Sequence, residues 1–313
     1  MLPTLQSLRF IFVMLIFMSH FAYHGVGAFD AGGDGGVAFF FLLSGFVVSL
    51  GYGRQLREGT FSYGRFMRRR LQKVYPLHLL CLLFFLAVAR PPLDLRVLLN
   101  VLLLQCWLPD ADYYYACNSV SWFLSSLMFS YLLFPLLFRL CRRRWFPPLL
   151  LAACAVVYVL TPYARITDIL YVNPLVRMVD FCLGIVLCRY FEQGVSVHAS
   201  SSSWQELLVT VFAVVAFMAY PLADGKLRNA PLFWLVLLPF ILVFARGGGV
   251  LSSFLCRRPL VWLGSLSMPL FMTHQLLIGI LTYRLFFLPY LSMLALCILA
   301  SLLISLLLSR VLP

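Results

Sequence analysis

The chain has 313 residues, of which 63% are hydrophobic and only 11% are charged, and its formal net charge is +13. The apolar share of a soluble globular domain is nearer one half, so this composition excludes that class. It indicates instead a protein that crosses a membrane several times.

Apolar segments suited to membrane-spanning helices recur along the whole chain. A spanning helix needs about 20 mostly apolar residues, and the sequence offers about ten candidates. They begin near residues 8, 37, 74, 122, 148, 174, 206, 230, 260 and 289. The first has no small-residue cleavage site, so we interpret it as a helix and not as a signal peptide. We predict an all-α polytopic membrane helix bundle forming a single domain over residues 1–313.

The basic residues predict the orientation. If both termini are cytoplasmic, all but seven of the 24 Lys and Arg fall on the cytoplasmic side. The others are Arg90, Arg96, Arg165, Arg177, Lys226, Arg228 and Arg284. Because membrane topology explains the positive charge, no nucleic-acid partner is predicted. The short apolar stretch 95–106 is predicted to be re-entrant or interfacial, since a full crossing there would place the basic cluster 142–144 outside.

The first segment contains two polar side chains, Arg9 and His20, in an otherwise apolar run. Their separation of eleven residues comes within about 20° of three helical turns and advances about 16.5 Å, so both side chains share one face. Ionisable groups inside a membrane usually face a polar cavity, which makes His20 a functional candidate. Alternatively, His20 and His24 only hydrogen-bond backbone carbonyls, and Arg9 extends to the lipid headgroups.

A glycine-rich loop, GAFDAGGDGG, follows on the expected outer side. Its Asp30 and Asp34 are candidates for orienting His20 or for binding sugar hydroxyls, although glycine-rich loops also simply make turns.

The loop after the second segment is strongly basic and includes Arg68, Arg69, Arg70 and Lys73. Such clusters ordinarily attract anionic membrane lipid. Guanidinium groups also bind phosphates through bidentate hydrogen bonds, so a cytoplasmic polyanion is the alternative ligand.

The longer outer loop, CWLPDADYYYACNSVSW, combines aromatic and polar side chains, among them Asn118 and Trp122. An aromatic belt at the membrane interface explains the tyrosine run, but aromatic faces beside acids and amides also suit a sugar. Cys106 and Cys117 form a disulfide or remain two free thiols. The nine Cys of the chain show no metal-ligand spacing, so no metal is predicted.

Several segments, in the expected order, resemble acyltransferase family three, bacterial membrane enzymes that O-acetylate cell-surface sugars. They are the R-x10-H spacing of Arg9 and His20, GGVAFFFLLSGF, FMRRRLQKVYPLHL, SWFLSSLMFSYLLFPLL and PLVWLGSLSMPLFMTHQ. The resemblance implies a multi-pass protein of the bacterial cytoplasmic (inner) membrane. Its expected reaction moves an acyl group from cytoplasmic acetyl-CoA or another acyl-CoA to a hydroxyl of an extracytoplasmic sugar or polysaccharide.

The resemblance also assigns roles near the cytoplasm. The R-x10-H pair is essential in the family, so His20 is the expected catalytic residue and Arg9 its partner. The family's R-x-x-R falls on Arg70 and Lys73, where Lys replaces the second Arg. We expect these two residues, with Arg68 and Arg69, to bind the CoA phosphates.

On the acceptor side, we expect contacts with the sugar from Asp30, Asp34, Asn118, Trp122 and His274, of which His274 matches a His of relatives. Many relatives have a Glu where this chain has Leu127, so a mechanism that needs that carboxylate does not apply. His20 would act as a general base or carry the acyl group transiently.

Two alternatives to an active enzyme follow from the same residues. One is a transporter or flippase in which His20, His24 and His274 relay protons. The other is an inactive scaffold, since the family Glu is absent. A helical membrane bundle is compatible with each.

Overall fold

The computed structural model describes residues 2–23, 26–27, 32–193, 200–229 and 231–311. The long helices are α1 (Pro3–His20), α2 (Gly33–Glu58), α3 (Tyr63–Ala89), α6 (Trp122–Leu140), α7 (Phe146–Leu160), α8 (Pro174–Gln193), α9 (Ser203–Ala219), α11 (Pro231–Arg246), α14 (Ser267–Arg284) and α15 (Tyr290–Val311). Each of the predicted apolar segments is therefore helical.

Short elements connect these helices. They are α4 (Leu95–Val101), α5 (Ala111–Tyr114), α10 (Gly225–Arg228), α12 (Val250–Leu255), α13 (Arg258–Ser265), the 3-10 turns η1 (Gln105–Trp107), η2 (Ser119–Ser121), η3 (Tyr163–Arg165) and η5 (Tyr220–Leu222), and the π-helical turn η4 (Thr167–Tyr171). Two-residue strands β1 (Ala22–Tyr23) and β2 (Val26–Gly27) pair antiparallel.

Seven of the described helical segments are long and apolar enough to cross a membrane, or eight if α13 and α14, which meet at a bend of 55°, form one span. Two of the predicted segments fail these criteria. α7 has only 15 residues, and α8 contains Arg177, Asp180, Arg189 and Glu192. The sequence prediction of about ten spans included both.

The helices differ in how much of their surface the protein itself covers. Over their most apolar windows α6 and α2 are 72% and 67% buried, whereas α9 and α15 are only 22% buried. Met218 on α9 and Leu299 on α15 are among the large apolar side chains left exposed. Lipid covers such faces in a membrane, while in water they would drive aggregation. The chain is a multi-pass membrane protein with α2 and α6 inside and α9 and α15 at the periphery.

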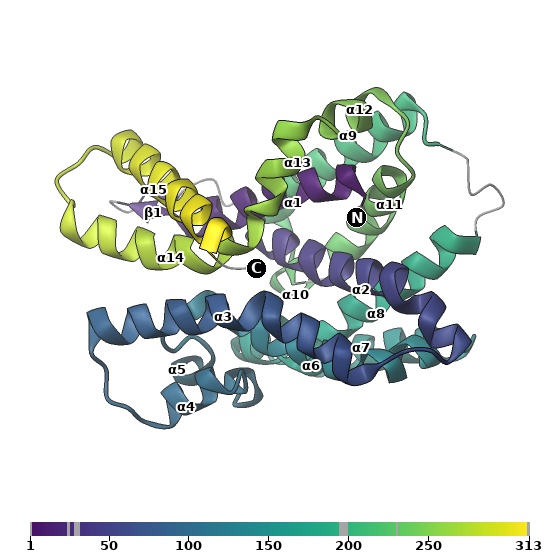
Figure 1. Ribbon diagram of the computed structural model, residues 1–313, viewed down its shortest axis with the longest axis horizontal. Helices are drawn as coiled ribbons and strands as arrows, with labels where there is room; N and C mark the ends of the chain where they lie inside the picture. Colours follow the sequence, from purple (N-terminus) through teal and green to yellow (C-terminus); the bar gives the residue numbers. More distant parts are fainter. Residues whose placement is uncertain (1, 24–25, 28–31, 194–199, 230, 312–313) are drawn as a thin grey trace.

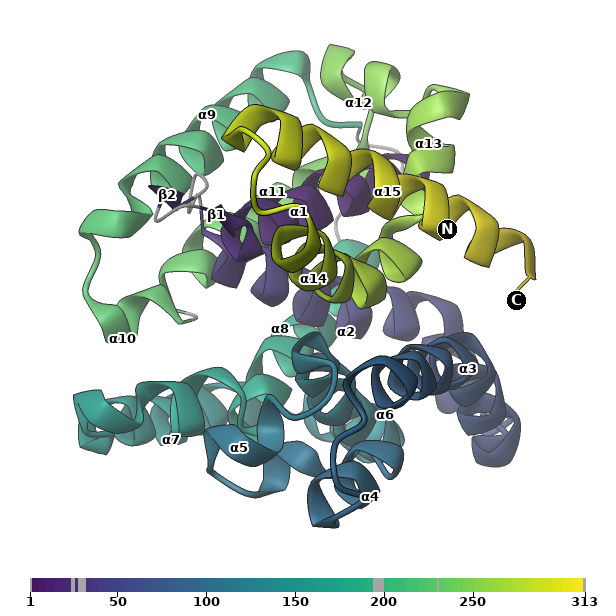
Figure 2. The ribbon, with the colours of Figure 1, turned by 90° about the vertical axis from the view of Figure 1, so that its left-hand side faces the viewer.

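Two groups of helices form the bundle, one with α3, α6 and α7 and the other with α9 and α11 to α15, and α2 and α8 lie where the groups meet (Figures 1 and 2). Glycines allow close contact there. A Cβ added at Gly45 would lie 2.0 Å from Phe181 O, and one at Gly184 would lie 2.1 Å from Leu42 O. Small residues at such contacts are typical of helix packing in membranes.

The same kind of contact places α1 against α2. A Cβ at Gly36 would lie 2.9 Å from Phe12 O, so a larger residue at position 36 would separate the two helices. α1 therefore holds Arg9 and His20 at fixed positions beside the central helix. In Figure 1 the α3–α4 and α14–α15 connections lie at the left end of the molecule, and the α2–α3 turn lies at the right end.

The stretch 95–106, predicted to be re-entrant or interfacial, is too short to cross a membrane. It forms α4 and then turns into η1. His78 Nε2 donates to Asn100 O at 2.9 Å, Tyr75 donates to Val101 O at 2.9 Å, and Ser125 donates to Leu103 O at 2.7 Å. These bonds hold the segment between α3 and α6.

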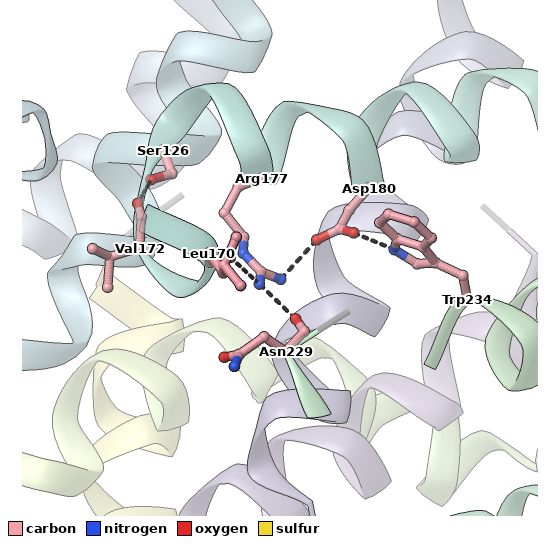
Figure 3. Close-up of polar contacts among 7 residues, drawn as sticks. All are labelled: Ser126, Leu170, Val172, Arg177, Asp180, Asn229 and Trp234. Carbon is pink, nitrogen blue, oxygen red and sulfur yellow. Dashed lines mark hydrogen bonds and ion pairs between the residues drawn. The ribbon is translucent and has the colours of Figure 1, made fainter. Parts of the chain in front are cut away.

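The charges of α8 are explained by a buried ion pair (Figure 3). Arg177, fully buried, places Nη1 2.8 Å from Asp180 Oδ2, and its Nη2 donates to Leu170 O and Asn229 O. Asp180 also accepts from the indole N–H of Trp234. The pair therefore connects α8 with η4 and with the segment leading into α11. Arg177 contributes to packing as well as to charge asymmetry.

Candidate active site

A pair of histidines lies where α1 ends against α14. His20 is the last residue of α1, and its Nδ1 lies 2.8 Å from Nε2 of His274, with the rings stacked at 5.1 Å between centroids. His274 is completely buried, and His20 is half-buried. The structure thus joins the predicted catalytic residue to a residue assigned to the acceptor site.

Hydrogen bonds determine which ring nitrogen carries the proton in a neutral pair. His274 Nδ1 lies 2.8 Å from Phe271 O and 3.1 Å from Leu270 O, and carbonyl oxygens only accept. Nδ1 of His274 is therefore the donor, and its Nε2 accepts from His20 Nδ1. This assignment leaves Nε2 of His20 with a free lone pair, which is the state that a general base needs.

The loop between η1 and α6 fixes α14 on both sides of His274. Asn118 donates to Met272 O at 2.9 Å, and Ser119 donates to Gln275 Oε1 at 2.6 Å. Asn118 is buried. Asn118, predicted to contact the acceptor, therefore helps to position α14, because its bond to Met272 O lies two residues before His274.

Three basic side chains, Arg9 of α1 and Arg70 and Lys73 of α3, line cavities beside the N-terminal part of α1. Arg9, Arg70 and Lys73 line a cavity of about 90 Å³ between α1, α2, α3, α6 and α14. Arg9 and Lys73 also line a second cavity of about 550 Å³ beside α13 and α15. The two cavities meet at these two side chains, so a ligand in the larger cavity lies next to the smaller one.

Among the described residues, no carboxylate lines either cavity beside these cations. In the described part of the chain, Nε of Arg9 and Nε of Arg70 are buried without a hydrogen-bond partner. The Arg70 guanidinium lies 5.5, 5.5 and 5.7 Å from the ring centroids of Tyr52, Phe66 and Tyr131. Uncompensated guanidinium groups with unused donors favour an anionic ligand, and phosphate suits their geometry.

The basic residues predicted to bind the donor separate into two sets. Arg70 and Lys73 line the cavities, whereas Arg68 and Arg69 line neither, and Lys73 is exposed as these two are. Leu127, at the position of the family Glu, lies in the wall of the smaller cavity. The change from Glu to Leu thus removes a carboxylate from beside the cations.

Sequence reasoning missed Trp262 and Arg310, which line the larger cavity from α13 and α15. Both lie far along the chain from the other lining residues. The only sequence signal available was their presence in apolar segments near the expected cytoplasmic side. The contact between α1 and α13 and that between α14 and α15 bring them to the cavity.

The remaining acceptor candidates lie in different surroundings. Asp34 is in the first turn of α2 and accepts from the Tyr220 hydroxyl. Trp122 is buried, with its ring centroid 4.8 Å from that of Tyr171. Asp30 and His24 lie outside the described residues.

Near this region the loop between η1 and α6 is held by Tyr114, whose hydroxyl donates to Asp168 at 2.6 Å. Burial, and then the hydrogen bond to Asp168, raise the pKa of Tyr114 above its ordinary value. The phenol therefore stays neutral and keeps donating. Both cysteines of the loop are free thiols, and Cys106 donates to Trp122 O.

Comparison with known proteins agrees with the architecture. The family model described as "Acyltransferase domain" matches residues 2–310. Acyltransferase MdmB of Streptomyces mycarofaciens is 31% identical over 231 residues, which cover 62% of this chain and 58% of that relative. Protein 2 in picA locus of Rhizobium radiobacter is 48% identical over 46 residues, or 15% of this chain and 24% of the relative. No solved structure matches the chain.

The helical bundle is that of a multi-pass membrane protein, and the chain spans less than two thirds of the length of the curated relatives that it matches. The chain belongs to acyltransferase family three, whose model covers almost its whole length.

Proposed function

We propose that the protein is an O-acyltransferase of the bacterial inner membrane that moves an acyl group from cytoplasmic acetyl-CoA, or another acyl-CoA, to a hydroxyl of an extracytoplasmic sugar or polysaccharide. One observation carries the proposal: a single helix, α1, presents Arg9 to the cation-lined cavities and His20 to a histidine pair that leaves one lone pair free. The two functions that transfer requires, anion binding and proton abstraction, lie about 16.5 Å apart along that helix.

The donor occupies the two cavities in this proposal. A volume of about 550 Å³ is within the range of small-molecule sites, which is roughly 300–1,000 Å³. Phosphates of the CoA nucleotide contact Arg310 and Lys73, and the Trp262 indole offers a face for the adenine. The pantetheine arm then extends through the smaller cavity past Arg70 and Arg9 toward His20, and the guanidinium N–H groups donate to its amide carbonyls.

The acyl group moves by general base catalysis. Nε2 of His20 takes the proton of the acceptor hydroxyl while the hydroxyl oxygen bonds to the thioester carbonyl carbon. The carbon–sulfur bond then breaks, and the departing thiolate takes the proton back from His20. The products are the acylated sugar and free CoA, and His274 holds the His20 ring in the required tautomer throughout.

Replacement of His20 tests the proposal. His20→Ala should lower acyl transfer by roughly 10²- to 10⁴-fold, the usual contribution of a general base, while acyl-CoA binding and thermal stability change little. His78→Gln is the matched control, because His78 is also a buried histidine on a helix and Gln can still donate to Asn100 O. This control should keep near-normal transfer.

The same assay separates an enzyme from a transporter. Retention of near-normal transfer by His20→Ala would refute the catalytic assignment. Movement of an intact glycan across proteoliposomes without any acyl-CoA would replace the proposal with a flippase in which the histidines relay protons.

A further inference from the structure

Three phenylalanines from three helices line the smaller cavity, and one of them, Phe271, lies next to His274. Phe40 is on α2, Phe123 on α6 and Phe271 on α14. Their ring centroids are 5.2 Å apart for Phe123 and Phe271, 6.4 Å for Phe40 and Phe123, and 6.5 Å for Phe40 and Phe271. These residues are called the phenylalanine cluster below.

The cluster touches both functional regions. On one side all three rings line the cavity of about 90 Å³, and the Arg9 guanidinium carbon lies 6.0 Å from the Phe40 centroid. On the other side the Phe271 centroid lies 6.1 Å from that of His274. Neither His20 nor His274 lines the cavity. Phe271 therefore lies between the smaller cavity and His274, and the other two rings pack against it.

The smaller cavity is narrow compared with its neighbour. Its volume of about 90 Å³ is well below that of the 550 Å³ cavity and below the roughly 300–1,000 Å³ of ordinary ligand sites. It admits a slender chain but not a bulky group. A reactive group that travels from the larger cavity to His20 must pass through this space and against the rings.

We propose that the phenylalanine cluster sets the length of the acyl group that the enzyme accepts, selecting acetyl over longer chains. The inference rests on the proposed function, because it takes the acyl group to arrive at the end of a CoA thioester. Each additional methylene needs volume that the rings occupy, and well-packed interiors resist such insertion. One methylene in an apolar pocket changes specificity by roughly 10- to 200-fold.

Shortening one ring side chain tests this selection. The values of kcat/KM for acetyl-CoA and hexanoyl-CoA are measured for the parent and for Phe123→Leu. The parent should favour acetyl-CoA by at least about tenfold, and Phe123→Leu should raise the hexanoyl-to-acetyl ratio by roughly tenfold or more. Phe134→Leu is the control, because Phe134 is fully buried on the same helix but does not line the cavity. Its ratio should equal that of the parent.

The outcomes separate this inference from the proposed function. Equal use of both thioesters by the parent, or an unchanged ratio in Phe123→Leu, overturns the selection by the cluster while acyl transfer itself stands. Absence of transfer from every CoA thioester overturns the proposed function and this inference with it. If Phe123→Leu does not fold, Phe271→Leu carries the same expected ratio change and the same refuting result.

Discussion

The pairing of His20 with His274 predicts opposite results for two conservative replacements at position 274. The amide of Gln can occupy the position of His274 Nε2 and accept from His20 Nδ1. The shorter Asn places its amide near the former Nδ1, where it can donate to Phe271 O but does not reach His20. His274→Gln should therefore preserve transfer, and His274→Asn should impair it.

The size of the loss follows from the 2.8 Å contact between the rings. Removing the acceptor leaves the N–H of His20 unpaired, which costs about 1–3 kcal/mol for a buried polar group. If that energy is lost in the transition state, kcat falls by roughly 5- to 150-fold, since 1.36 kcal/mol is tenfold. This loss is smaller than that expected for His20→Ala, because the base itself remains.

The assay is steady-state acyl transfer by both purified variants, with acyl-CoA binding and thermal melting measured on the same samples. A merely structural His274 would make both variants lose stability and activity together. Parent-like kcat in His274→Asn, or equal losses in His274→Gln and His274→Asn, would refute the tautomer argument.

Three other replacements test the cavities and the packing. Arg70→Gln should weaken acyl-CoA binding by roughly 10- to 150-fold, because hydrogen bonds to charged groups contribute about 1.5–3 kcal/mol. Arg68→Gln is the control at an exposed residue and should change the dissociation constant little. Equal effects of the two replacements in a binding titration would remove Arg70 from the donor site. Arg177→Met should lower the free energy of unfolding by about 3–5 kcal/mol, because Asp180 is left without its ion-pair partner. Adding Asp180→Asn should restore part of the lost stability. Additive losses from the two replacements in denaturant titrations would contradict the ion-pair account. Glu206→Ala should destabilise the protein by about 1–3 kcal/mol without changing kcat, because its buried carboxylate accepts from Gly249 N and Ser252 N; an unchanged melting temperature would show that these bonds contribute little.

Local patterns in the sequence were sufficient to predict the helices and the positions of Arg9 and His20 along the first of them. Apolar runs determine helices in a membrane because every backbone group must be hydrogen-bonded within its own segment. The eleven-residue spacing placed both side chains on one face, and the structure has Arg9 at the cavities and His20 at the far end of α1.

Helical periodicity could also have divided the basic cluster. Arg70 and Lys73 are three residues apart and share a face, whereas Arg68 and Arg69 are turned away from Arg70 by about 200° and 100°. In the structure the first two line the cavities and the other two line neither.

Long-range contacts could not be predicted in this way. His20 and His274 are separated by 254 residues, and their contact depends on how α14 packs against α1. The sequence predicted Asn118 as a sugar ligand from an amide among aromatic residues, but its bond to Met272 O joins residues that are 154 positions apart and has no local sequence signal. Arg177 was interpreted from charge asymmetry alone, since a charge that is paired inside the bundle has the same local sequence as one near a helix end.

In the proposed reaction an acyl group moves from the cytoplasmic side of the membrane to an acceptor on the other side, with His20 as the general base. Inverted membrane vesicles expose the cytoplasmic face, so acetyl-CoA labelled in its acetyl group can be supplied to that face alone and the label in the enclosed glycan measured. The account predicts labelled glycan with the parent protein and none above background with His20→Ala. Equal labelling by the two proteins, or labelling only when acetyl-CoA is supplied to the opposite face, would contradict it.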